Sequence, residues 1–193
     1  DPCFLCYQPP VETPEPCLDD PSRPPTFGSF NAIQKLNPEL LTLWAGLMRS
    51  VPASRLVLKA DLRLTSVVSR IRNMFKSSGV DPDRLTFLSN TRTPQEARAL
   101  YSRIDVALDT YPYNGTTTTC ESLWMGVPVV ARLGATHVQR VSASLLHATG
   151  LPDLVATSTD SYLEIARNMV LDRDRVLLLR RTLRDQMRGS VLC

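Results

Sequence analysis

Asp105-Val-Ala-Leu-Asp-Thr-Tyr-Pro-Tyr-Asn-Gly-Thr-Thr-Thr-Thr-Cys-Glu121 contains, in order, a short apolar run, a turn and the start of a helix. The apolar run 106–108 is typical of a buried strand. Pro112 and the pair Asn114-Gly115 are turn residues, and they lead into a helix expected to begin near Thr117. A strand that passes through a tight turn into a helix is the first half of a parallel βαβ unit.

On both sides of this stretch the chain continues to alternate strands with helices. The Thr93-to-Glu96 segment is typical of a capping box with proline at the first helical position, and Gly79 is a plausible C-cap for the helix before it. Further strands are expected at 26–30, 55–58, 85–88 and 127–131, and helices at 38–50, 64–78, from 94 onward, 137–149, 159–170 and 172–188. Such alternation predicts an α/β fold with a doubly wound, Rossmann-like parallel sheet.

The composition changes near residue 26. Residues 1–25 hold eight prolines and little apolar periodicity, so they are expected to form an extended arm or interdomain connector. Residues 26–193 would form one Rossmann-like domain. Because the chain begins with Asp1 rather than Met, we also expect that an upstream portion is missing.

The overall charge and hydropathy exclude several classes of protein. The chain has 22 basic and 19 acidic residues, which are interleaved, so no nucleic-acid partner is expected. The Arg-rich stretch 172–188 contains three aspartates and is interpreted as the solvated face of a helix. No run of 18 apolar residues and no signal peptide is visible, so we expect no membrane partner and a cytoplasmic location.

The five cysteines do not form a disulfide framework. Cys3 and Cys6 form a C-x-x-C motif with Cys17 nearby, but a closed zinc site needs four ligands. Reduced thiols are the better interpretation, and no metal is expected. Of the two histidines, His147 is interpreted as a packing residue, whereas His137 is a candidate to face a ligand.

The four threonines 116–119 predict a phosphate site. The first turn of a helix offers unpaired amides and a partial positive charge, which suit a diphosphate. Threonine hydroxyls add donors, Gly115 allows close approach of the backbone, and Glu121 is placed to accept hydrogen bonds from a ribose diol. The alternative is that one threonine merely caps the helix.

Two other strand exits are candidates for the same site. Lys35 follows the first strand and could neutralise a leaving diphosphate, and Lys59 after the second strand is a weaker candidate of the same kind. The segment 89–93 could cradle a base through its backbone. The absence of GxGxxG and P-loop motifs argues against a dehydrogenase and against an ATPase.

These segments, in this order, resemble the protein O-linked N-acetylglucosamine transferase and SPINDLY family (glycosyltransferase family 41), in its bacterial or SPINDLY-like branch. The resemblance covers essentially the whole chain and is most specific from Tyr113 to Pro128. It is carried by Cys6-Tyr-Gln-Pro-Pro10, Thr26-Phe-Gly-Ser-Phe-Asn31, Lys35, Arg55-Leu-Val-Leu-Lys59, Asp105-Val-Ala-Leu-Asp109, Pro112-Tyr-Asn-Gly-Thr-Thr-Thr-Thr-Cys-Glu-Ser-Leu-Trp-Met-Gly-Val-Pro128 and Arg140-Val-Ser-Ala-Ser144.

The resemblance implies that this chain is the C-terminal, donor-binding domain of a GT-B glycosyltransferase. The implied activity is inverting, metal-independent transfer of a sugar from a UDP- or GDP-sugar to Ser or Thr of an acceptor protein, with no cofactor. Lys35 would stabilise the leaving group, while the general base would lie outside this chain. The implied nucleotide-sugar contacts are Asn31, Lys35, Asn114, Gly115, Thr116, Thr117, Thr118, Thr119 and Glu121.

The resemblance leaves several points open. The family's N-terminal catalytic domain and tetratricopeptide repeats are absent from this chain, and Ala97 stands where the family usually has a histidine near the base. The donor is expected to be UDP-N-acetylglucosamine, with GDP-fucose as the alternative. A noncatalytic nucleotide-binding or interaction module is the competing function, and a nucleotide-sugar epimerase is disfavoured by the run 114–121.

Overall fold

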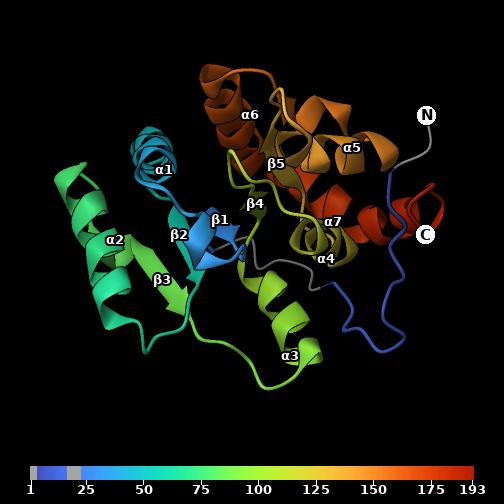
Figure 1. The fold of residues 1–193 in the computed structure, drawn as a ribbon, viewed down its shortest axis with the longest axis horizontal. Coiled ribbons are helices and arrows are strands. Elements are labelled where there is room, and N and C mark those ends of the chain that lie inside the picture. Colours follow the sequence, from blue (N-terminus) through green and yellow to red (C-terminus); the bar gives the residue numbers. More distant parts are fainter. Residues whose placement is uncertain (1–3, 17–22) are drawn as a thin grey trace.

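The computed structural model describes residues 4–16 and 23–193, and its centre is a six-stranded sheet in which every pair of neighbours is parallel (Figure 1). The strand order is β3-β2-β1-β4-β5-β6. This order places the topological switch point between β1 and β4, where doubly wound sheets bind their ligands. The strands are β1 (Thr26–Ser29), β2 (Arg55–Lys59), β3 (Leu85–Leu88), β4 (Val106–Leu108), β5 (Val129–Arg132) and β6 (Val155–Ala156).

Helices cover both faces of the sheet. On one face of the sheet, α1 contacts α2 and α6 (Figure 1). On the other face α4 contacts α5, and α3 lies on the same side. Helix α7 contacts both α4 and α6. None of the helices in the described ranges is long and apolar enough to cross a membrane. The helices are α1 (Pro38–Ser50), α2 (Thr65–Ser77), α3 (Pro94–Ala99), α4 (Thr117–Trp124), α5 (Val141–Ala148), α6 (Thr159–Leu171) and α7 (Arg173–Arg188).

The core lies between the sheet and these helices, and the sequence explains why. The central strands are apolar on both faces, as expected where helices cover both sides: Phe27, Leu56 and Val106 are fully buried. From α1, Trp44 is fully buried against them and donates a hydrogen bond from its indole Nε1 to the hydroxyl of Tyr162 on α6 (3.2 Å). The predicted fold class is therefore confirmed.

Most predicted elements are present, and the differences have local causes. Strand β5 begins at Val129 rather than Val127, because the amide of Val127 closes the end of α4 and Pro128 has no amide. The helix expected from His137 is a short 3-10 turn followed by α5, which begins at Val141. The two-residue strand β6 was not predicted, since so short a segment carries no readable alternation.

The described part of the arm contains no helix or strand but lies against the domain. The amide of Tyr7 donates to the carbonyl of Leu192 (2.6 Å), and Arg184 donates to the carbonyl of Pro14 (2.6 Å). The ring of Tyr7 also lies 6.4 Å from that of Trp124 on α4. The arm is therefore joined to the domain by backbone and ring contacts.

The interpretation of residues 172–188 as a solvated face is wrong for two of the arginines. Arg180 and Arg184 are only 1% and 6% exposed. Arg180 donates to the carbonyls of Tyr101 and Ile104, at 3.2 and 2.5 Å. These arginines are buried because they satisfy backbone carbonyls that α7 covers, a use that periodicity alone does not reveal.

Candidate functional site

The turn between β4 and α4 is held by a dense set of hydrogen bonds. The amide of Gly115 donates to Oδ1 of Asp109 (2.7 Å), and the Asn114 side chain donates to the carbonyl of Thr110 (3.0 Å). A Cβ atom on Gly115 would lie 2.6 Å from Oγ1 of Thr119, a distance that real structures do not tolerate. Glycine is therefore required here by packing rather than by its backbone angles.

The four threonines take different positions around the start of α4. Thr116 is the N-cap residue, but its side chain makes no capping hydrogen bond, so simple capping does not explain the run. Thr117 is exposed and Thr118 is half-buried. Thr119 is buried with its hydroxyl 3.0 Å from that of Ser142, which in turn donates to the carbonyl of Gly115 (3.0 Å).

Lys35 is brought to this turn from the other side. It ends a short 3-10 helix after β1, and its ammonium donates to the carbonyl of Asn114 (2.9 Å) and to Oδ1 of Asn31 (3.5 Å). The same ammonium lies 4.2 Å from the centre of the Tyr113 ring. Partial burial lowers the pKa of Lys35, and the Asp109 carboxylate opposes that shift. The ammonium is thus fixed beside the start of α4.

Asp109 organises the site, and the sequence reasoning gave it no role. It directly follows β4, is 2% exposed, and its Oδ1 also accepts a hydrogen bond from the side chain of Asn31 (3.4 Å). Burial raises its pKa to about 6, against the opposing effects of the Gly115 amide and Lys35. A carboxylate placed directly after an apolar strand was the signal that could have identified it.

Glu121 lies one turn into α4 and is half-buried. Burial raises its pKa, while the positive charges of Arg98 and Lys59 oppose that shift. At the carboxyl ends of β1, β2 and β3, a hollow of about 420 Å³ is lined by Phe30, Asn31, Ala32, Ile33, Gln34, Lys59, Ala60, Asp61, Leu64 and Asn90. A cavity of this size accommodates part of a nucleotide.

The structure therefore brings most of the predicted residues to the switch point of the sheet. Asn31, Lys35 and the turn 114–118 adjoin one another, whereas the side chains of Asn114 and Thr119 face protein partners. Sequence reasoning missed Asp109, and it also missed the buried Arg98, which donates to the carbonyl of Glu12 (3.1 Å).

The remaining candidates lie elsewhere. His147 is exposed, so its assignment as a packing residue was wrong; its Nδ1 lies 2.8 Å from the carbonyl of Ala143. The ring of His137 contacts Phe4, with centroids 5.2 Å apart. Cys3 and Cys17 fall outside the described residues, so the interpretation of the C-x-x-C motif stays a prediction.

Comparison with known proteins points to one family. A sequence model described as glycosyl transferase family 41 matches residues 18–193. A relative from Arabidopsis thaliana, named as a probable UDP-N-acetylglucosamine--peptide N-acetylglucosaminyltransferase SPINDLY, is 40% identical over 99% of this chain. A Caenorhabditis elegans UDP-N-acetylglucosamine--peptide N-acetylglucosaminyltransferase is 35% identical over 80% of it. The chain spans only 21% of the plant relative and 13% of the nematode one.

Solved structures agree with this assignment. A Thermobaculum terrenum O-GlcNAc transferase mutant superposes with a TM-score of 0.86 and 38% identity, over 94% of this chain and 34% of that one. A Thermosynechococcus elongatus sucrose-phosphate synthase, at 17% identity and a TM-score of 0.66, shows the same fold over 88% of this chain and 42% of its own. The chain has the parallel sheet of a GT-B glycosyltransferase domain and belongs to glycosyl transferase family 41.

Proposed function

We propose that this chain is the donor-binding half of an inverting, metal-independent protein O-glycosyltransferase. In this proposal it binds a nucleotide sugar, and a domain outside this chain completes the active site and presents Ser or Thr of an acceptor protein. Lys35 stabilises the leaving diphosphate, and the general base comes from the other domain. The names of the relatives support N-acetylglucosamine from UDP-N-acetylglucosamine as the donor group, with GDP-fucose as the alternative.

One observation carries the proposal: a lysine ammonium is fixed beside a helix start whose N-cap side chain leaves the first-turn amides uncapped. A diphosphate at this position would accept hydrogen bonds from those amides and from the Thr117 hydroxyl, while Lys35 balances its charge. As the bond to the sugar breaks, negative charge grows on the diphosphate. A cation already held in place stabilises that charge more than it stabilises the intact donor.

The ribose and base would extend from this point toward the hollow between β1 and β3. There Glu121 would accept hydrogen bonds from the ribose hydroxyls, and the base would lie near Asn90. Ala97 is half-buried on α3 and offers no hydrogen bond to a base. The absence of a hydrogen-bonding side chain at position 97 favours the competing function, a noncatalytic nucleotide-binding module.

Calorimetry of UDP and GDP binding to the 193-residue chain tests the donor-binding role. Lys35→Met should weaken binding of either nucleotide by roughly tenfold to a hundredfold, since a charged hydrogen bond contributes about 1.5–3 kcal/mol. Lys76→Met, an exposed lysine on α2, is the matched control and should leave binding unchanged. Equal binding by both variants would place the diphosphate elsewhere.

The preference between UDP and GDP decides the donor class. Tighter binding of UDP supports N-acetylglucosamine transfer, and tighter binding of GDP supports fucose transfer. To separate an enzyme from a noncatalytic module, the chain must be joined to the N-terminal part of a family member and assayed with labelled donor. We further propose a cytoplasmic location, in keeping with the thiols of Cys6 and Cys193, which form no disulfide among the described residues.

A further inference from the structure

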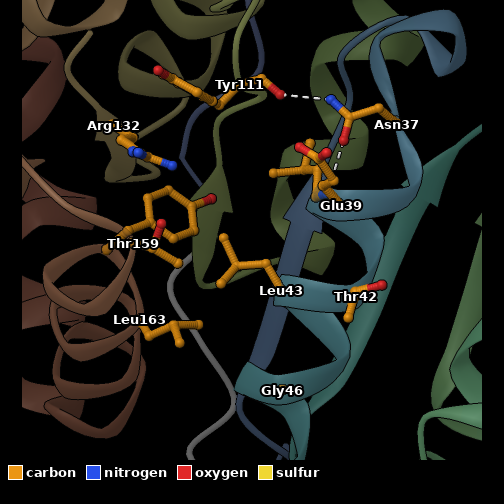
Figure 2. A pocket seen from close by; sticks show the side chains of 11 residues that line it. Asn37, Glu39, Thr42, Leu43, Gly46, Tyr111, Arg132, Thr159 and Leu163 are labelled. Carbon is orange, nitrogen blue, oxygen red and sulfur yellow. Dashed lines mark hydrogen bonds between the residues drawn. The ribbon is translucent and has the colours of Figure 1, made fainter.

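A second cavity lies next to the proposed donor site, between helices α1 and α6 (Figure 2). Its volume is about 520 Å³. One wall comes from the first turns of α1 and the other from the start of α6, and Tyr111 and Arg132 close one end. These elements follow β1, β4, β5 and β6, so the groove opens at the carboxyl edge of the sheet, where parallel α/β proteins bind ligands.

The walls of the groove are largely apolar, and Gly46, which has no side chain, leaves part of the groove open. Leu43 of α1 and Leu163 of α6 face the cavity, and Gly46 lies one turn further along α1 (Figure 2). A Cβ atom on Gly46 would meet only the end of the Arg49 side chain, at 3.8 Å. Glycine inside a helix weakens the helix relative to alanine. Packing therefore does not require glycine here, and a larger side chain at position 46 would extend into open space.

Arg132 supplies the polar end of the groove. Its guanidinium stacks over the Tyr111 ring, 4.4 Å from the ring centre. Within the described part of the chain it forms no salt bridge, and its Nε is buried without a hydrogen-bond partner. A guanidinium held flat with unused donors matches the geometry of a carboxylate. Glu39 lies at the exposed rim, where it would disfavour a second acidic group.

The groove and the donor site share one turn. Tyr111 lines the groove and is held there by Asn37, whose side chain donates to the Tyr111 carbonyl (2.9 Å; Figure 2). Two residues later, Tyr113 lies under the ammonium of Lys35. A ligand in the groove would therefore end at the turn 111–113, which also borders the proposed donor site.

We propose that this groove binds a segment of the acceptor protein, in which an acidic residue pairs with Arg132 and an apolar residue lies between Leu43 and Leu163. The proposal rests on the proposed function, since it takes the acceptor to be a polypeptide. Three features support this occupant: the apolar walls, the unfilled positive charge and the continuity with the donor site. The groove thus contributes to the choice of acceptor sequence.

The test uses fluorescence anisotropy with the 193-residue chain and labelled octapeptides. The probe contains two leucines, one aspartate and one serine among glycine and alanine, and a second probe has lysine in place of aspartate. Gly46→Leu fills the groove and Arg132→Gln removes its charge; Gly46→Ala, which favours the helix while leaving most of the space, is the control. UDP and GDP binding is measured on every sample.

Gly46→Leu should weaken binding of the aspartate peptide by about tenfold or more, and Arg132→Gln by a similar factor, since each removes a main contact. Gly46→Ala should bind within about twofold of the unchanged chain, and nucleotide affinity should stay constant in all three variants. The lysine peptide should bind more weakly than the aspartate peptide to the unchanged chain, and Arg132→Gln should not weaken its binding further.

Equal binding of both peptides, or binding that survives both groove variants, would overturn the proposal. So would a dimer in sedimentation velocity that Gly46→Leu dissociates, because the groove would then hold a second copy of the chain. If Gly46→Leu fails to fold, Arg132→Gln alone decides. If the unchanged chain binds the peptide but neither UDP nor GDP, the proposed donor-binding role is refuted and the proposed peptide groove is not.

Discussion

At the scale of single residues, the residues of the turn 114–119 differ in their surroundings and in the roles that we expect of them. Asn114 and Thr119 form hydrogen bonds with protein atoms and shape the turn, whereas Thr117, the first residue of α4, is exposed. Four identical-looking threonines in the sequence therefore have different surroundings. We expect the two outer positions at the helix start, 117 and 118, to contact the nucleotide.

Replacing Thr117 and Thr118 together by valine should weaken UDP or GDP binding by roughly tenfold to several hundredfold, since each hydroxyl bond to a charged group contributes about 1.5–3 kcal/mol and neighbours are not additive. Valine keeps the branched shape, so the melting temperature should change little. Thr182→Val on α7, far from the site, is the control. Calorimetry and thermal unfolding on the same samples check both parts; unchanged affinity would refute the phosphate assignment.

Asp109 gives a pH-dependent prediction. Its pKa in the folded protein, about 6, lies above the ordinary value of 3.8, so the folded state binds the proton more tightly than the unfolded state. This group therefore lowers the free energy of unfolding as pH rises from about 4 to about 6, and the full cost, about 2–3 kcal/mol, remains above that range.

Asp109→Asn keeps an oxygen that can accept the Gly115 amide but removes the buried charge. The variant should be more stable than the unchanged chain at pH 7.5, and the difference should vanish as pH falls toward 4. Urea unfolding at pH 4.5, 6 and 7.5 measures it. A variant that is less stable at pH 7.5 would show that the pairing with Lys35 outweighs the cost of burial.

At the scale of elements, helix α7 packs against the amino-terminal edge of the sheet, opposite the proposed site. Arg180 donates to the carbonyls of Tyr101 and Ile104, which precede β4. Its guanidinium lies 4.0 Å from the buried carboxylate of Asp105, which also accepts a hydrogen bond from the amide of Thr26 (2.7 Å). The helix approaches the end of α4 so closely that a Cβ on Gly126 would lie 2.6 Å from the Arg180 carbonyl oxygen. This helix is therefore part of the core.

Arg180→Met should lower the free energy of unfolding by about 3–5 kcal/mol, because it leaves buried carbonyls without donors and removes a buried charge near Asp105. Arg181→Met changes the exposed neighbour in the same way and should cost no more than about 0.5 kcal/mol. Urea denaturation of the two variants gives the comparison directly. Similar losses in both would mean that α7 contributes through its apolar face alone.

At the scale of the whole molecule, we propose that the groups that hold the nucleotide lie in this chain, whereas the general base lies in another domain. The chain spans 34% of the Thermobaculum transferase chain that it matches. The proposed site lies at the open carboxyl edge of one sheet, so a second domain has room to close over it.

The 193-residue chain alone should bind UDP or GDP but transfer no sugar, because in the proposed function the general base belongs to a domain outside this chain. Calorimetry with both nucleotides, alongside an assay with radiolabelled donor and a peptide acceptor, checks this. Turnover by the isolated chain would show that it holds a complete active site.

Nucleotide binding should not require a divalent metal, since Lys35 and the first-turn amides of α4 supply the positive field that a metal supplies in other enzymes. Titration with and without a chelator should give affinities within about twofold. A loss of about tenfold or more with the chelator would indicate a metal at the diphosphate.

Cys3→Ser combined with Cys6→Ser should leave the nucleotide affinity and the melting temperature unchanged.

The sequence by itself determined the order of strands and helices, the β4–α4 turn as the candidate site and the resemblance to the family, because each depends on residues close together in the chain. Apolar runs, Pro112, Gly115 and the threonines act locally, so their spacing is readable. Only the tertiary structure decided which side chains face protein and which stay open: Arg180 of α7 is buried against the segment before β4, and Thr119 is buried beside Ser142 of α5, and both pairs of segments are distant in sequence. The same holds for Asp109, whose raised pKa depends on burial by several elements, and for the groove between α1 and α6, which exists only where two separate helices meet.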